Sequence, residues 1–389
     1  MKRSSKPIDR FDWTLCLLLL LFFIVSCVAI YSAQQTAIPK DNYLFKQIRW
    51  YVIGVIIIAG FMYFDSEQIR KITWGLYGFG IILLFILAVS PITKFTPSIN
   101  NAQSWFKLPF IGTIQPSEFM KVFLILALAN IVFQHNEKTI IKTLKTDFYL
   151  LIKIGFITFL PIVLVMCQPD LGTSLVILAI MTGMIFASGI SWRIILPIYG
   201  MGATIAGTIL YFVIWAPSIL EKYLHVMPYQ FDRIYSWLDP ASNPTTGYQL
   251  LNSLKGIGSG LLTGNGLGDS KVHIPENHTD FIFSVIGEEY GFIGSSIVVS
   301  LFFLLIYHLI KTALDTTDSF NTYLCVGIIC MITFHVFQNI GMTIQVLPIT
   351  GIPLPFISYG GSSLMGNMMA MGLIFSIRFH HKSYMFSSE

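Results

Sequence analysis

The segment 273–292, HIPENHTDFIFSVIGEEYGF, combines reactive side chains with a sharp change from polar to apolar sequence. Asp280 is the last polar residue before the apolar run that begins at Phe281. A carboxylate at such a boundary is partly desolvated, which raises its pKa and suits it to act as a general base on a substrate at the membrane surface. The alternative role for Asp280 is a helix N-cap.

Other ionisable residues of this segment are weaker candidates for the same chemistry. His278 lies two residues before Asp280, where a histidine is more often hydrogen-bonded in a turn. Glu288 and Glu289 lie about two turns beyond Asp280, inside the apolar run. A carboxylate there needs a partner in the protein interior, so Glu288 is expected either to make a packing hydrogen bond or to contact substrate.

A second motif, QPSEFMK at 115–121, places Glu118 and Lys121 three residues apart. Pro116 is typical of the first position of a helix, so the two side chains share one helical face and can pair. The pair either fixes helix packing or forms a polar wall of a substrate cavity, which would position a pyrophosphate or a sugar, or relay a proton. In the second case Gln115 and Ser117 are further substrate-binding candidates.

Two more segments carry polar residues at the edges of apolar runs. In QPDLGTS, 168–174, Asp170 is expected to be an N-cap, with a cavity role as the alternative. In GIPLPFISYGGSSL, 351–364, the prolines prevent a continuous helix and Gly360–Gly361 permits close backbone approach. This segment either packs helices closely or lines a cavity, with Ser358 and Ser362 as candidates to bind substrate.

The elements that position these residues are membrane helices. Of the 389 residues, 54% are hydrophobic and 11% are charged, and the apolar residues come in long blocks. This composition excludes a soluble enzyme, a disordered chain and a nucleic-acid-binding protein. The five cysteines lie in or beside apolar blocks without metal-binding spacing. Ten runs are long enough to span a bilayer, near 13–33, 47–64, 74–90, 117–134, 148–166, 171–188, 191–213, 281–308, 322–346 and 357–378.

The predicted fold is therefore an all-α polytopic membrane protein of about ten transmembrane helices, forming a single integral-membrane domain over 1–389. Lys and Arg in the short loops fall mainly on the side of the N-terminus, so both termini are expected in the cytoplasm. A large extracellular loop, 214–280, then lies between helices 7 and 8. It contains Arg233 and the glycine-rich stretch 256–268. This stretch is either a flexible linker, or its leucines make it pack onto another element or dip into the membrane interface. Trp105 lies in another outer loop, where an aromatic anchor is the alternative to a substrate role.

Taken together and in this order, QPSEFMK, QPDLGTS, PENHTDFIFSVIGEEYG and GIPLPFISYGGSSL resemble the SEDS family (shape, elongation, division and sporulation) over essentially the whole chain. The segment 229–249, YQFDRIYSWLDPASNPTTGYQ, is most similar to the elongation branch, with the division branch next. The resemblance implies a peptidoglycan glycosyltransferase of the bacterial cytoplasmic membrane. Such an enzyme polymerises lipid II into β-1,4 glycan strands by inverting transfer and releases undecaprenyl pyrophosphate.

The resemblance also implies roles for single residues. Asp280 matches the essential loop carboxylate of the family, and Trp105 matches an important outer-loop position. Lys121 and Arg233 are then candidates to assist the leaving pyrophosphate, with Glu118 orienting Lys121 or a sugar hydroxyl. One departure is Thr113, because some relatives have Arg two residues before the Gln of QPSE. Any phosphate contact made there by an Arg must come from elsewhere or be absent.

The implied partners are a class B penicillin-binding protein, which crosslinks the product, and other membrane proteins of the elongation complex. A divalent cation, Mg²⁺ or Mn²⁺, would suit the pyrophosphate, but no ligand cluster marks its site, so the metal residues are unknown. Two alternatives stay open. A flippase for lipid II would depend on Glu118 and Lys121 more than on Asp280. A non-catalytic scaffold for the transpeptidase would tolerate loss of the Asp280 carboxylate but not bulky changes on its helix faces.

Overall fold

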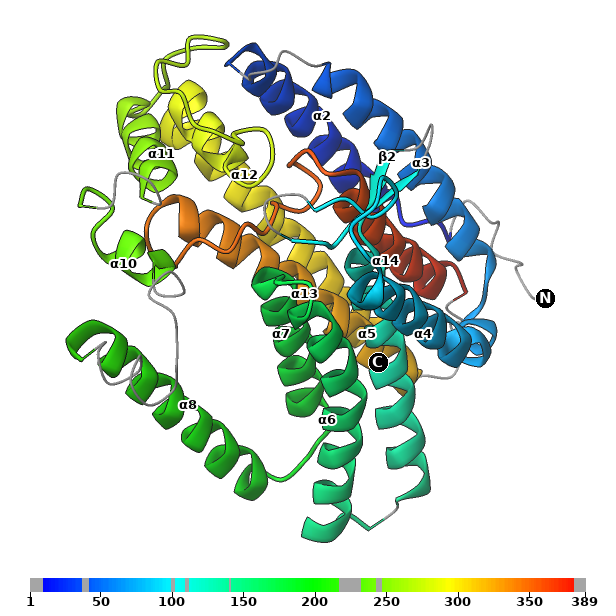
Figure 1. The fold of residues 1–389 in the computed structure, drawn as a ribbon. Helices are drawn as coiled ribbons and strands as arrows, with labels where there is room; N and C mark the ends of the chain where they lie inside the picture. The colour runs from blue at the N-terminus through cyan, green and yellow to red at the C-terminus, as the bar shows by residue number, and fades with distance from the viewer. Residues whose placement is uncertain are drawn as a thin grey trace.

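The computed structural model describes residues 10–36, 42–98, 102–108, 112–139, 141–216, 232–242 and 247–380. In these residues each of the ten predicted apolar runs corresponds to one long helix (Figure 1). The helices are α2 (Trp13–Thr36), α3 (Tyr43–Tyr63), α4 (Ser66–Val89), α5 (Pro116–Lys138), α6 (Leu144–Met166), α7 (Leu171–Ala187), α8 (Trp192–Trp215), α12 (Ile282–Asp315), α13 (Ser319–Thr343) and α14 (Gly361–His380).

Eight of these helices are long and apolar enough to cross a membrane, and α7 is a shorter apolar helix. The predicted class, an all-α polytopic membrane protein, is confirmed, while the number of ten crossings stays a prediction. Several predicted boundaries were wrong because a search for apolar runs misses polar first and last turns. Helix α4, for example, was expected to begin near 74. It begins at Ser66, and Asp65 and Gln68 form a capping box at this start.

Helix α5 forms the centre of the bundle, in contact with α4, α6, α7, α13 and α14. Its side chains are buried on all sides from Met120 to Val132, as expected for a helix surrounded by other helices. Pro116 occupies its first turn, as predicted. A short antiparallel hairpin leads into it, made of β1 (Phe106–Leu108) and β2 (Gly112–Ile114), which the sequence analysis did not anticipate.

Glycines let α14 approach its neighbours closely, which is one of the two roles expected for Gly360–Gly361. A Cβ on Gly361 would lie 2.4 Å from the Trp50 ring of α3, and one on Gly366 would lie 2.9 Å from the Glu118 carbonyl oxygen of α5. Substitution at either position must push these helices apart. Helix α8 is different, since Ile195 and Val213 are its only buried residues in the described structure and it lies apart from the central helices in Figure 1.

The glycine-rich stretch 256–268 packs against a kink in α12 and forms hydrogen bonds to its backbone. Gly291 has φ +62° and interrupts the helical ladder there. The 261–266 backbone satisfies the freed groups: Asn265 N–H donates to the Glu288 carbonyl (3.0 Å), and Phe292 N–H donates to the Leu261 carbonyl (2.9 Å). The stretch therefore does pack, but through its backbone and glycines. Of its leucines, Leu261 is 80% exposed.

The rest of the predicted loop 214–280 is partly helical. It contains α10 (Asp232–Leu238) and α11 (Tyr248–Ser259), and α11 packs on α12 and α13. Residues 217–231 and 243–246 lie outside the described residues, so the motif 229–249 is described only in part. Trp237 of α10 donates its indole N–H to the Gln345 carbonyl at 2.9 Å, which ties this loop to the segment 344–360 between α13 and α14.

Candidate active site

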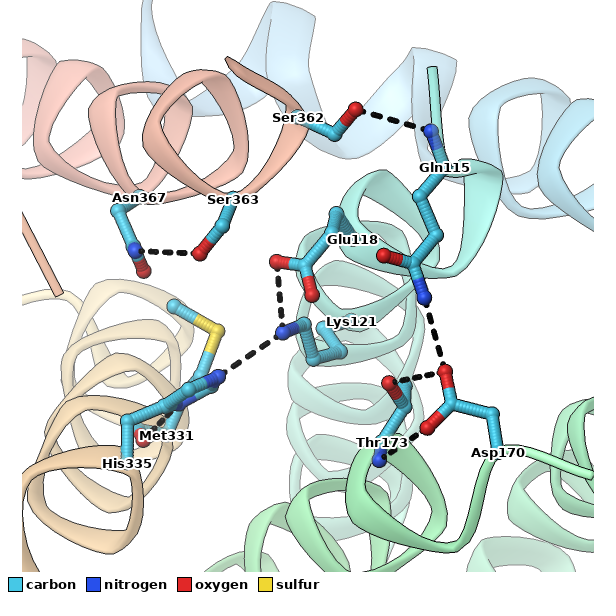
Figure 2. A network of polar contacts seen from close by, with 10 residues as sticks. All are labelled: Gln115, Glu118, Lys121, Asp170, Thr173, Met331, His335, Ser362, Ser363 and Asn367. Carbon is cyan, nitrogen blue, oxygen red and sulfur yellow. Dashed lines mark hydrogen bonds and ion pairs between the residues drawn. The ribbon is translucent and has the colours of Figure 1, made fainter. Parts of the chain in front are cut away.

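The predicted pair of Glu118 and Lys121 is present in the first turns of α5. Lys121 Nζ lies 2.8 Å from Glu118 Oε2. Both residues are buried, with Glu118 5% exposed and Lys121 2% exposed. Lys121 Nζ also lies 2.9 Å from His335 Nε2 of α13, as Figure 2 shows. A cation and an anion this deep in a helical bundle require such mutual compensation.

The hydrogen bonds of His335 determine what charge it adds beside Glu118 and Lys121. Its Nδ1 lies 2.7 Å from the Met331 carbonyl oxygen, which can only accept a hydrogen bond, so the proton is assigned to Nδ1. Nε2 is then the acceptor for the Lys121 ammonium, and the histidine is neutral. Sequence reasoning missed His335, although a histidine inside the apolar run 322–346 is itself a signal for a functional or paired group.

A second chain of contacts links the start of α5 to α7 and α14 (Figure 2). Gln115 Nε2 donates to Asp170 Oδ2 at 2.8 Å, and Gln115 N–H donates to Ser362 Oγ at 2.9 Å. Asp170 is the N-cap of α7, as predicted, and its Oδ1 accepts from the Thr173 N–H at 3.0 Å. The sequence-predicted residues Gln115, Asp170 and Ser362 are thus brought together by direct contact.

These contacts bring the N-termini of three helices, α5, α7 and α14, to one place. A helix N-terminus carries partial positive charge and unpaired N–H groups, which favour anions. Ser117, in the first turn of α5, is 1% exposed and its hydroxyl has no hydrogen-bond partner among the described residues. A buried hydroxyl without a partner costs free energy, so this group is available to a ligand.

The cap at Asp170 gives a measurable expectation. Asp170→Ala removes the α7 cap and the Gln115 contact together, so it should lower the free energy of unfolding by about 1–2 kcal/mol. Asp170→Asn keeps a capping oxygen and should retain most of that stability. Thermal unfolding in detergent measures both. The matched control is Asp318→Ala, which removes the α13 cap (Asp318 Oδ1 to Phe320 N–H, 3.0 Å) without touching this network. Equal losses for both alanine variants would contradict a contribution from Gln115.

Asp280 lies just before α12, half-buried, at the edge of the same region. Its Oδ1 accepts a hydrogen bond from Thr279 Oγ1 at 2.8 Å. Its Oδ2 is near Gly351 of the segment 344–360, whose added Cβ would lie 3.6 Å away. Burial raises the pKa of Asp280, the nearby Glu276 charge raises it further, and the Thr279 hydrogen bond lowers it in part.

Helix α13 joins the two halves of the site. Asn339 Nδ2 donates to the Asp280 carbonyl oxygen at 2.7 Å and to the Ile352 carbonyl oxygen at 2.8 Å. Asn339 is four residues after His335, so the two side chains lie on one face, about 6 Å apart along the axis. One fully buried face of α13 therefore positions both Asp280 and Lys121.

The other predicted residues lie around this core in different ways. His278 stacks on Tyr43 at 4.1 Å, and its carbonyl oxygen accepts from the Tyr359 N–H at 2.8 Å. Ser358 Oγ accepts from the Leu354 N–H at 2.8 Å within the turn before α14. His278 thus ties the segment that carries Gly351 to the approach to α12, and Ser358 stabilises the turn within that segment.

Glu288, Trp105 and Arg233 have separate surroundings. The Glu288 carboxylate accepts from the N–H groups of Lys271 (2.6 Å) and Val272 (3.1 Å), so it anchors the outer loop to α12. Trp105 is half-buried beside Ser104, whose Oγ donates to the Gln168 carbonyl at 3.1 Å. Arg233 is exposed on α10 and is not part of the contacts drawn in Figure 2.

A divalent cation needs several oxygen ligands that converge on one point. Within the described ranges no three His, Cys, Asp or Glu side chains converge as a metal cluster. A fixed all-protein cage of the kind that holds a resident metal therefore does not fit these residues. Mg²⁺ can instead be held by one or two carboxylates together with substrate phosphates. The predicted cation stays a prediction.

Comparison with known proteins places this architecture in a family. The family described as "Cell cycle protein", whose model name combines FtsW, RodA and SpoVE, matches residues 9–383. The chain belongs to this family, the SEDS family. Stage V sporulation protein E of Bacillus subtilis (strain 168) is 33% identical over 94% of this chain and 96% of its own length. Peptidoglycan glycosyltransferase RodA of Treponema pallidum (strain Nichols) is 31% identical over 96% and 98%.

A solved structure agrees with the same assignment. It is described as "Structural coordination of polymerization and crosslinking by a peptidoglycan synthase complex". It matches with a TM-score of 0.77 at 27% identity, over 95% of this chain and 97% of that chain. The predicted membership of the SEDS family and its polytopic fold are thereby confirmed. The two relatives named above differ by only two percentage points in identity, so identity alone does not separate the branches of the family.

Proposed function

We propose that this SEDS protein is a peptidoglycan glycosyltransferase that polymerises lipid II, with Asp280 as its general base. The observation that carries the proposal is the arrangement on α13, where Asn339 holds the Asp280 backbone and His335, one turn away, holds Lys121. A protein that is similar to this chain over nearly its whole length is named peptidoglycan glycosyltransferase RodA. A carboxylate with a raised pKa, a buried cation held by the same face of α13, and converging helix N-termini suit transfer of a sugar from a pyrophosphate.

In the proposed step, Asp280 accepts the proton of the C4 hydroxyl of a GlcNAc unit. The hydroxyl oxygen forms a bond to C1 of the MurNAc at the end of the lipid-linked chain. The bond from C1 to the pyrophosphate oxygen breaks, the anomeric centre inverts, and undecaprenyl pyrophosphate leaves. A single displacement of this kind needs a base at the acceptor and positive charge at the leaving group.

The positive charge at the leaving group would come from Lys121 and the N-termini of α5, α7 and α14. Preorganised N–H groups and cations stabilise a developing anion without rearranging at the moment of reaction. Because Glu118, Lys121 and His335 are all buried, their contact with a pyrophosphate requires the start of α5 to separate from α13. Arg233 lies on the exposed outer loop and would reach the same leaving group from outside.

The proposal extends to partners and location. A class B penicillin-binding protein would crosslink the product, which accords with the peptidoglycan synthase complex whose polymerising and crosslinking activities are named together. The multi-pass fold would lie in the bacterial cytoplasmic membrane with both termini in the cytoplasm. The segment 229–249 supports a role in elongation, with other elongation-complex membrane proteins as further partners.

The test is glycan synthesis from labelled lipid II by the purified protein with its transpeptidase, with crosslinking blocked by a β-lactam. Long glycan ladders on a gel are the expected result. If the folded, partner-bound protein makes no ladders, the proposal that it is a glycosyltransferase is wrong. Transport of labelled lipid II across proteoliposomes by that same preparation would then identify a flippase, and its absence would leave a scaffold.

The pH dependence of the reaction reports on Asp280. The carboxylate must be deprotonated to accept a proton, so its raised pKa places the acid limb of the rate profile above the usual range of an aspartate. Thr279→Val removes a hydrogen bond to the charged form, which raises the pKa and moves the limb to higher pH. Glu276→Gln removes a like charge and moves the limb to lower pH. Initial rates of polymerisation across pH measure both shifts, and two unmoved profiles would assign the base to another group.

A further inference from the structure

A hollow of about 630 Å³ lies between α4, α5 and α6, at the opposite end of α5 from Glu118. Its walls include the apolar side chains of Trp74, Ile152 and Phe156. His135, in the last turn of α5, also lines it. His135 is seventeen residues after Glu118, which corresponds to about 25 Å along the helix. The hollow is therefore separate from the candidate active site.

Two lysines give the hollow an unbalanced positive charge. Lys138 ends α5, and Lys153 is nine residues into α6, about 13 Å along that helix. Lys153 Nζ lies over the Tyr149 ring, 4.2 Å from its centroid, which directs the ammonium back toward the start of α6. In the part of the chain that the structure describes, neither lysine forms an ion pair with a carboxylate.

The nearby charged groups do not cancel this excess. Asp147, in the first turn of α6, is buried, and its Oδ2 accepts from the Ser191 N–H at 2.9 Å. Lys142 adds a further positive charge and donates to the Ser188 carbonyl at 3.3 Å. Glu137 is exposed beside Lys138 but does not line the hollow. The hollow therefore has a net positive lining, made by Lys138 and Lys153, that suits an anionic ligand.

The apolar part of the hollow indicates what accompanies the anion. Phe156 is 72% exposed, Ile152 is 52% exposed and Trp74 is 44% exposed, on helices that are long and apolar enough to cross a membrane. Free inorganic phosphate has no apolar part that could cover this surface. A lipid presents a phosphate at the membrane interface and acyl chains beside it, which matches both halves of the hollow.

We propose that this hollow binds an anionic phospholipid. Its phosphate would lie between Lys138 and Lys153, and an acyl chain would lie along Ile152 and Phe156. With the predicted orientation, the site faces the cytoplasmic leaflet, whereas Asp280 faces the outer one. The bound lipid would neutralise Lys153 inside the span and hold the ends of α5 and α6 together. Because α5 also carries Glu118 and Lys121, the lipid would stabilise the central helix of the bundle.

The test measures lipid binding to the intact purified protein by native mass spectrometry, with phosphatidylglycerol and phosphatidylcholine as probes. Phosphatidylglycerol should bind and phosphatidylcholine should not. Lys138→Gln and Lys153→Gln should each weaken phosphatidylglycerol binding roughly fivefold. Lys311→Gln, at an exposed lysine near the end of α12, is the matched control and should change nothing.

A second pair of variants tests the acyl-chain half. Phe156→Ala should weaken binding, while Phe159→Ala should not, because Phe159 is 64% exposed on α6 but does not line the hollow. Equal binding of both lipids, unchanged binding in the lysine variants, or complete displacement by inorganic phosphate at the lipid's own concentration would each overturn the proposal. A further arm needs no variant: raised salt should weaken phosphatidylglycerol binding to the wild-type protein, and a salt-independent affinity would also overturn it.

Discussion

Replacement of Asp280 by Asn is expected to lower the rate of glycan polymerisation by a factor of about 10²–10⁴, the usual contribution of a general base. The amide has nearly the shape of the carboxylate but cannot accept the proton of the attacking hydroxyl. The fold should be retained, because Asn339 bonds to the backbone carbonyl of residue 280 rather than to its side chain. Thr279 Oγ1 can still donate to the amide oxygen. The assay is ladder formation from labelled lipid II with the transpeptidase present.

The control for this substitution is Glu276→Gln, which removes a neighbouring exposed carboxylate. Its plateau rate at high pH should equal that of the wild type, even though its acid limb shifts. Thermal unfolding of the Asp280→Asn variant shows whether the protein is intact. An intact Asp280→Asn variant with the wild-type rate would exclude Asp280 as the base and favour a flippase or a scaffold.

Much of the candidate site was predictable because its signals are local in sequence. Glu118 and Lys121 are three residues apart after a proline, so a helix must place them together. Asp170 precedes an apolar run in the pattern of an N-cap, and the structure confirms the cap. Asp280 stands out because it is the last charge before a long apolar stretch.

The contacts between helices could not be predicted in the same way. His335 and Lys121 are 214 positions apart, so only the packing of α13 against α5 brings them together. Asn339 was missed for the same reason, since its partners are backbone carbonyls that leave no mark in the sequence. The kink at Gly291 depends on hydrogen bonds from the outer loop, and a glycine in an apolar run does not by itself predict one.

The second large effect is expected at the buried pair. Lys121→Met leaves the Glu118 carboxylate buried without its cation, which should cost about 3–5 kcal/mol of unfolding free energy. The double variant Glu118→Gln and Lys121→Met removes both charges and should recover most of that loss, because no unpaired charge is left in the interior. Unfolding in mixed micelles measures the coupling between the two sites. Lys311→Met, at an exposed lysine, is the control for the loss of a lysine alone.

Activity of the double variant then separates the two interpretations of the pair. If Lys121 stabilises the leaving pyrophosphate, the double variant should polymerise lipid II about 10²–10³-fold more slowly than the wild type even though it is folded. This is the usual loss when one preorganised donor is removed. If the pair only fixes the packing of α5 against α13, the recovery of stability should bring the rate back with it. Wild-type activity in a stable double variant would therefore assign the pair to structure and leave Asp280 and the helix N-termini as the chemical part of the site.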